Sequence, residues 1–199
     1  MTMSLLLVRI RESLTEPNVR SYLVGRTLAW MGFAWMPFVA VHFAAGGLTD
    51  AVIIQAGAAL TVGSAVGCVV LGRLGDVRGH RLGAIIGVAA QVGALLALLL
   101  IPGLVGCLSV FICAGLTNAG LTVSHNNVIL ETCPHDDRVS HLVALNLIGG
   151  IVGVGVPFIT GPVVAAWGSP VLFMMSLALS VAGLLWLCVA VREPRDIGN

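Results

Sequence analysis

The fold is decided by residues 139–191, which read VSHLVALNLIGGIVGVGVPFITGPVVAAWGSPVLFMMSLALSVAGLLWLCVAV. These 53 residues contain no Asp, Glu, Lys or Arg. A membrane-spanning helix needs about 20 apolar residues, so the run is long enough for two such helices. Trp167-Gly168-Ser169-Pro170 supplies turn-forming residues between them. The stretch therefore predicts two membrane-spanning helices joined by a short turn.

The same pattern continues toward the amino terminus. Residues 82–130 form an uncharged run of 49 residues, divided by Pro102-Gly103, and two shorter uncharged runs flank Asp50. These segments are apolar on all sides, and they lack the two-residue alternation of a membrane β-barrel. The sequence therefore predicts an all-α integral membrane protein with a six-transmembrane-helix bundle over 22–191 and tails at 1–21 and 192–199. The expected helices are 22–45, 52–72, 82–100, 104–130, 141–167 and 170–191.

The composition of the 199 residues excludes several classes of protein. Hydrophobic residues make up 58% and charged residues 10%, whereas a soluble domain carries about 25% charged residues. A net charge of +1 gives nucleic acid little to bind. Five cysteines without CxxC spacing do not form a disulfide framework. The sequence has no paired carboxylates in its spans and no HExxH motif, so we expect no enzyme activity, no metal and no cofactor.

Arginine alone determines the expected orientation, because the chain contains no lysine. All ten arginines fall in or beside the two tails and the segments that follow the second and fourth predicted helices. None falls in the segments that follow the first, third and fifth helices. The positive-inside rule then predicts a multi-pass protein of the plasma (inner) membrane with both termini in the cytoplasm.

A glycine-rich and charged segment joins the second and third predicted helices. Residues 72–81 read GRLGDVRGHR, and the small residues allow a tight turn and close helix approach. The side chain of Asp76 suits a helix amino terminus, and the arginines suit acidic partners or lipid phosphates. The residues alone leave a second interpretation open, which is a solvated positive loop.

This segment resembles the GxLaDrxGrr signature of major facilitator superfamily (MFS) transporters, which joins helices 2 and 3. The positions that fit are Gly72, Leu74, Asp76, Gly79, His80 and Arg81. Val77 departs from the pattern at a position that is commonly basic, and Arg78 follows it. The family has twelve helices in two repeats of six, so the chain resembles one repeat. The absence of arginine between residues 104 and 130 favours the carboxyl-terminal repeat.

The resemblance implies transport of a small solute by alternating access, with a second half supplied by a homodimer or a partner chain. It also implies a conformational switch formed by Gly72, Leu74, Asp76, Arg78, Gly79 and Arg81. The expected partners are membrane lipid and a small-molecule substrate that the sequence does not identify. The alternative is a non-transporting protein, either a truncated transporter remnant or an accessory membrane subunit.

Polar residues recur on one face of the fourth predicted helix. Asn118, Thr122 and His125 are spaced i, i+4 and i+7, and polar groups within a membrane face protein or water. The resemblance implies that helices 1 and 4 line a central cavity, which adds Trp30 and Phe33 of the first helix as candidates. The alternatives are helix–helix contacts for Asn118, water at the membrane edge for His125, and packing for the aromatic side chains.

The segment between the fourth and fifth predicted helices carries both signs of charge. Glu131 and Arg138 flank it, with Asp136 and Asp137 between them. With the arginines of the 72–81 segment they form a candidate ion-pair network that stabilises one conformation. An exposed ion pair contributes only about 0–1 kcal/mol, so such a network needs several pairs. The alternative is a solvated loop.

Overall fold

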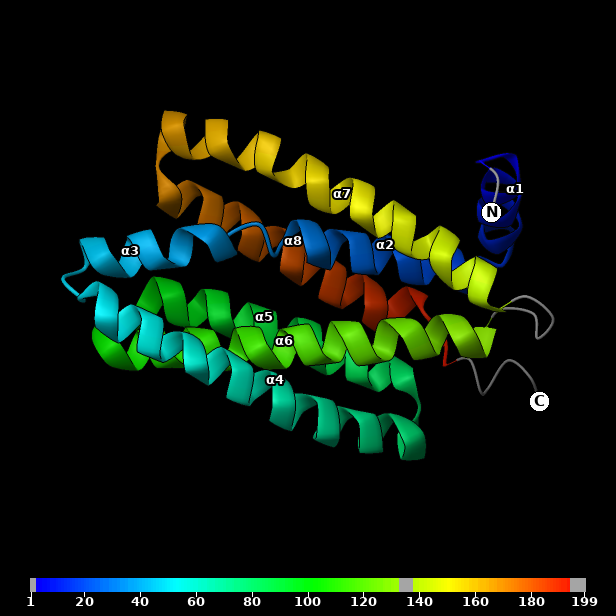
Figure 1. Ribbon diagram of the computed structural model, residues 1–199, viewed down its shortest axis with the longest axis horizontal. Helices are drawn as coiled ribbons and strands as arrows, with labels where there is room; N and C mark the ends of the chain where they lie inside the picture. The colour runs from blue at the N-terminus through cyan, green and yellow to red at the C-terminus, as the bar shows by residue number, and fades with distance from the viewer. Residues whose placement is uncertain (1–2, 133–137, 194–199) are drawn as a thin grey trace.

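The structure is a computed structural model that describes residues 3–132 and 138–193. The described part is all α, apart from one short 3-10 helix (η1) and the turns (Figure 1). Its elements are α1 (Met3–Thr15), α2 (Pro17–Met31), η1 (Met36–Phe38), α3 (Val39–Ala45), α4 (Asp50–Arg78), α5 (His80–Leu100), α6 (Gly103–Thr132), α7 (Arg138–Trp167) and α8 (Ser169–Ala190).

Six helical segments of the described chain are long and apolar enough to cross a membrane. They are α2 to α3 taken together, and each of α4, α5, α6, α7 and α8. The prediction of an all-α protein with six membrane spans is therefore confirmed. Large hydrophobic side chains are exposed on the outside of the bundle, as expected for contact with lipid; examples are Ile54, Phe158 and Val189.

Several helices are longer than predicted. α4 continues past residue 72 to Arg78, α7 begins at Arg138, and α2 begins at Pro17 within the expected tail. The 29 residues of α4 rise about 43 Å at about 1.5 Å per residue, whereas the hydrocarbon core of a bilayer is about 30 Å thick. The charged ends of these helices therefore extend beyond the apolar layer. A prediction from hydropathy alone stops at the edge of that layer and makes the helices too short.

The first span is interrupted, although the sequence predicted one helix over 22–45. Residues 32–38 form turns and η1, held by backbone bonds of the i to i+3 type such as Phe38 N to Trp35 O at 2.9 Å. Pro37 has no N–H to continue an α-helix. The backbone at Gly32 packs so closely on Ser180 and Gln91 that a side chain would not fit there. The expectation of a single helix is therefore wrong.

Gln91 of α5 compensates for this interruption. Its Nε2 donates to the carbonyl oxygen of Ala29 at 2.8 Å and to Ser180 Oγ of α8 at 2.7 Å. Carbonyl groups at a helix end lack partners within the helix, and lipid offers none. The completely buried Gln91 therefore satisfies a backbone group at the end of α2 and ties α2, α5 and α8 together.

Glycines bring the helices of the bundle into close contact. An added side chain at Gly63 of α4 would meet the backbone of Ile112 in α6, and one at Gly87 of α5 would meet the backbone of Gly120 in α6. On the other side, Gly183 of α8 lies against the backbone of α2 at Ala29. These small residues therefore serve packing within the chain.

Five arginines mark one end of the bundle, which we call the arginine end: Arg73, Arg78, Arg81, Arg138 and Arg192. Here α4 meets α5, α7 begins and α8 ends (Figure 1). α1 lies at the same end (Figure 1) and is joined to α7 by a hydrogen bond between Ser13 Oγ and His141 Nδ1 at 2.5 Å. In the same view α4 and α7 form the two edges of the bundle.

Candidate functional site

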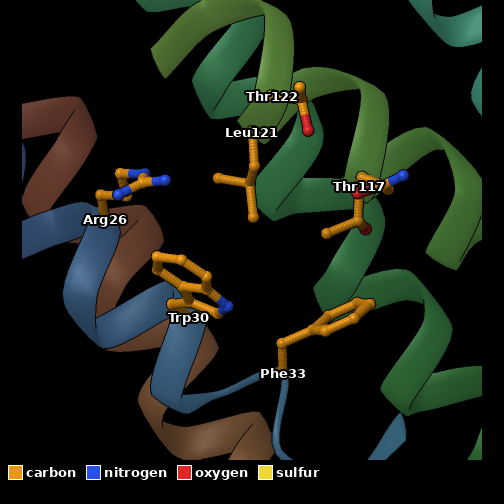
Figure 2. A pocket seen from close by; sticks show the side chains of 7 residues that line it. Arg26, Trp30, Phe33, Thr117, Leu121 and Thr122 are labelled. Carbon is orange, nitrogen blue, oxygen red and sulfur yellow. The ribbon is translucent and has the colours of Figure 1, made fainter. Parts of the chain in front are cut away.

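A small cavity lies between α2 and α6 (Figure 2). Its volume is about 120 Å³. Four of the five predicted cavity residues, Trp30, Phe33, Asn118 and Thr122, line it, together with Arg26, Thr117 and Leu121. Aromatic side chains come from the α2 side and hydroxyl and amide groups from α6. The i, i+4 spacing in α6 and the i, i+3 spacing in the first span place these residues on facing surfaces.

A second and larger cavity adjoins the first. Its volume is about 440 Å³, and it lies between the interrupted segment at 32–38 and α7. Trp30 and Phe33 line both cavities, so the two aromatic side chains form a shared wall. The ring of Trp30 also packs on Gly149 of α7, where a side chain would collide with it. The interruption of the first span therefore shapes one side of the second cavity.

The polar residues of α6 differ in their surroundings. Thr117 is buried and donates from Oγ1 to the carbonyl oxygen of Cys113 at 2.9 Å. Asn118 and Thr122 are exposed while they line the cavity. Among the described residues, no side chain of a neighbouring helix hydrogen-bonds to Asn118. Its position favours a role in the cavity over one in helix–helix contact.

His125 lies outside the residues that line the cavity. It is 2% exposed, its Nε2 lies 3.2 Å from Asn146 Oδ1 of α7, and its ring stacks on Tyr22 of α2 with centroids 5.9 Å apart. His125 shares the helical face of Asn118, but seven residues correspond to about 10 Å along the helix axis. At that level α2, α6 and α7 are in contact through Tyr22, His125 and Asn146.

Arg26 is a cavity residue that the sequence did not reveal. Its guanidinium carbon lies 4.5 Å from the centroid of the Trp30 ring, a cation–π contact. The sequence places Arg26 at the start of the first span, but α2 begins nine residues earlier at Pro17. The sequence did contain one indication of this role. Arg26, Trp30 and Phe33 are spaced i, i+4 and i+7, which places them on one face of a helix.

The segment expected as a loop at 72–81 is almost entirely helical. Residues 72–78 complete α4, His80 begins α5, and Gly79 alone joins them with a φ of 93°. The prediction of a loop is therefore wrong, because both helices continue beyond the apolar layer. Leu74 is partly buried, Arg78 is exposed, and Gly72 has open space where a side chain would lie.

The junction between α4 and α5 is attached to the end of α8. Arg81 donates from its backbone N–H to Glu193 Oε2 at 3.1 Å, and from Nη2 to the carbonyl oxygen of Cys188 at 2.6 Å. The Glu193 carboxylate lies so close to Gly79 that a side chain at that position would collide with it. The Glu193 carboxylate lies at the start of α5, and the Arg81 guanidinium lies at the end of α8. The helix dipole favours a negative group at a helix start and a positive group at a helix end, so both contacts are stabilising.

His80 connects this junction to α6. Its Nε2 lies 3.9 Å from Asp76 Oδ1 and 3.9 Å from Glu131 Oε1. The Asp76 side chain is 75% exposed. Arg138 begins α7. The other members of the proposed ion-pair network, Asp136 and Asp137, lie outside the described residues, and so does Arg195 of the carboxyl-terminal tail.

Compared with known proteins, the chain matches no protein family model, no curated protein and no solved structure. The coarse class, a six-span helical membrane protein, follows from the helices themselves.

Proposed function

We propose that the protein is a half-size transporter of the MFS type that moves a small solute across a membrane by alternating access. The observation that supports this proposal best is the cavity between α2 and α6. Asn118 and Thr122 line it and are exposed on a single chain. Polar groups in a membrane face protein or water, so a second bundle on this side completes a closed site.

The second half is either another copy of this chain or a partner chain. The halves of an MFS-type transporter are related by an axis along the membrane normal, which is the symmetry that a parallel homodimer provides. The two bundles then rock about the central site. In this proposal the arginine end faces the cytoplasm of the plasma membrane, in agreement with the positive-inside rule.

The contacts around Gly79 suit a switch at the cytoplasmic side. Glu193 and Arg81 join the α4–α5 junction to α8, and His80 lies between Asp76 and Glu131. Such contacts hold the ends of four helices together in one conformation. Of these side chains Asp76 is exposed, and an exposed pair contributes only about 0–1 kcal/mol, so its contact with His80 is easily exchanged for another.

Cysteine accessibility tests the proposal without knowledge of the substrate. All five native cysteines are replaced by serine, and Thr122→Cys introduces a single thiol in the cavity. A charged methanethiosulfonate, which does not cross membranes, is then applied to right-side-out and to inside-out vesicles. Alternating access predicts that Thr122→Cys reacts from both sides.

Two exposed positions serve as matched controls. Ile54→Cys lies on the outside of α4 and is expected to stay unlabelled in lipid, whereas Val77→Cys at the arginine end is expected to react from one side only. Labelling of Thr122→Cys from one side only, or from neither, would contradict transport and favour the accessory or remnant alternative.

A further inference from the structure

We propose that the cavity binds a small organic anion, a carboxylate with a flat apolar body, and that Arg26 holds its charged group. This inference rests on the proposed function, because it names the class of solute that is moved. The relevant juxtaposition is a guanidinium beside the Trp30 ring, with Phe33 beyond it, facing an amide and two hydroxyl groups across a cavity (Figure 2).

The position of Arg26 is the first argument. It lies nine residues into α2, about 14 Å along the helix, where the apolar part of the first span begins, and it is partly buried. A charged side chain that turns into a helical bundle at such a position is costly and usually marks a ligand or ion site. The other arginines of the described spans lie near helix ends, where water and lipid headgroups are within reach.

The unused donors of Arg26 are the second argument. A guanidinium carries five N–H donors in one plane. The contact with Trp30 is a cation–π contact of the guanidinium carbon with the ring and uses none of these donors in a hydrogen bond. Within the described residues, no side chain or carbonyl group accepts a hydrogen bond from Arg26, and no carboxylate forms an ion pair with it. A carboxylate matches the edge of the guanidinium plane by two parallel hydrogen bonds.

The cavity walls define the rest of the ligand. No Asp or Glu is among the seven residues that line the cavity, so the site offers a cationic substrate no carboxylate, and the positive charge of Arg26 disfavours it. Trp30 and Phe33 offer flat apolar surfaces, on which aromatic rings stack favourably. Asn118 and Thr122 can hydrogen-bond to further polar atoms of the ligand. The combination selects a negative group at one end and an apolar ring beside it.

Binding of radiolabelled benzoate to the full chain in mild detergent tests this inference. Benzoate carries the carboxylate, whereas benzamide and benzylamine keep the ring and replace the carboxylate by a neutral or a positive group. We expect saturable benzoate binding that unlabelled benzoate displaces, and at least tenfold weaker competition by benzamide, benzylamine and sulfate. Equal competition by benzamide, or complete displacement by sulfate, would overturn the assignment of an organic anion.

Two variants locate the site. Arg26→Gln is expected to weaken benzoate binding at least tenfold, whereas Arg73→Gln, which removes an exposed arginine from the arginine end, is expected to leave it unchanged. Thr122→Phe, which fills the cavity from an exposed position, is expected to abolish binding even if Arg26→Gln fails to fold. Binding that survives in a folded Arg26→Gln or in Thr122→Phe, or the absence of benzoate binding to the original chain, would refute the proposal.

The two proposals fail in different ways. Binding in detergent does not require translocation, and thiol labelling does not require a ligand. Benzoate binding with one-sided labelling of Thr122→Cys would contradict transport and retain the anion site. Labelling from both sides without benzoate binding would contradict the anion site alone.

Discussion

Replacement of Gly79 by alanine tests how the α4–α5 junction is built. Gly79 has a φ of 93° and a ψ of 151°, a region that only glycine populates easily. A residue with a side chain pays about 1–3 kcal/mol of backbone strain there. The new Cβ would also displace the Glu193 carboxylate. Glutamate is flexible enough to rotate away, but it then loses its bond to the backbone N–H of Arg81.

The expected destabilisation follows from these two effects. A hydrogen bond to a charged group contributes about 1.5–3 kcal/mol when it is shielded from water, and the contact at Glu193 is only partly buried. The lower ends of the two ranges together give about 2.5 kcal/mol for Gly79→Ala. The free energy of unfolding can be measured by titration of the detergent-solubilised protein with sodium dodecyl sulfate.

Gly72→Ala is the matched control. Gly72 lies within α4 and has open space at the position of a Cβ, so alanine is expected to stabilise the helix by about 0.5–1 kcal/mol. In a Glu193→Ala background, Gly79→Ala should cost only its backbone strain. Equal effects of Gly79→Ala and Gly72→Ala would refute this account of the junction, as would an unchanged cost of Gly79→Ala in the double variant.

Two further predictions concern the membrane interior and the switch. Gln91→Leu removes the donor to the Ala29 carbonyl and to Ser180 and should lower the free energy of unfolding by about 1–2 kcal/mol. Ser180→Ala keeps the bond between Gln91 and Ala29 and should lower it by less. Equal losses in the two variants would contradict the role of the bond to Ala29. Asp76→Asn should slow the labelling of Thr122→Cys from one side, because Asp76 lies near His80 at the proposed switch. The affinity for benzoate should stay unchanged, because Asp76 is not among the residues that line the cavity. Unchanged labelling rates would contradict a role of Asp76 in the switch.

Hydropathy and helical spacing predicted much of the arrangement. The six spans could be predicted because long uncharged runs are divided by glycine and proline at the turns, as at Pro102-Gly103. The polar face of α6 could be predicted because Asn118 and Thr122 are four residues apart, whereas the pairing of this face with the first span was implied only by the family resemblance. The first signal is local in sequence, and the second depends on the tertiary structure.

The features that could not be predicted depend on where helices begin and end. Arg26 was assigned to the membrane edge, because polar neighbours such as Asn18 and Arg20 hid the early start of α2 at Pro17. The helical state of residues 72–78 was missed because charge is a poor guide to helix ends beyond the apolar layer. His125 shares a face with Asn118, but only the packing of Tyr22 and Asn146 determines its distance from the cavity.

The interruption of the first span also determines how the wall that carries Arg26 and Trp30 is held. Because Gln91 of α5 donates to the Ala29 carbonyl at the end of α2 and to Ser180 of α8, separating α2 from α5 would leave a backbone carbonyl without its partner. The wall that carries Arg26 and Trp30 is therefore fixed to the rest of the bundle. Beyond the interruption, α3 is anchored separately: Val39 and Phe43 are buried in the core, and His42 packs edge-on against Phe173 of α8 with ring centroids 5.3 Å apart. Both parts of the first span are therefore held by the bundle, each by its own contacts.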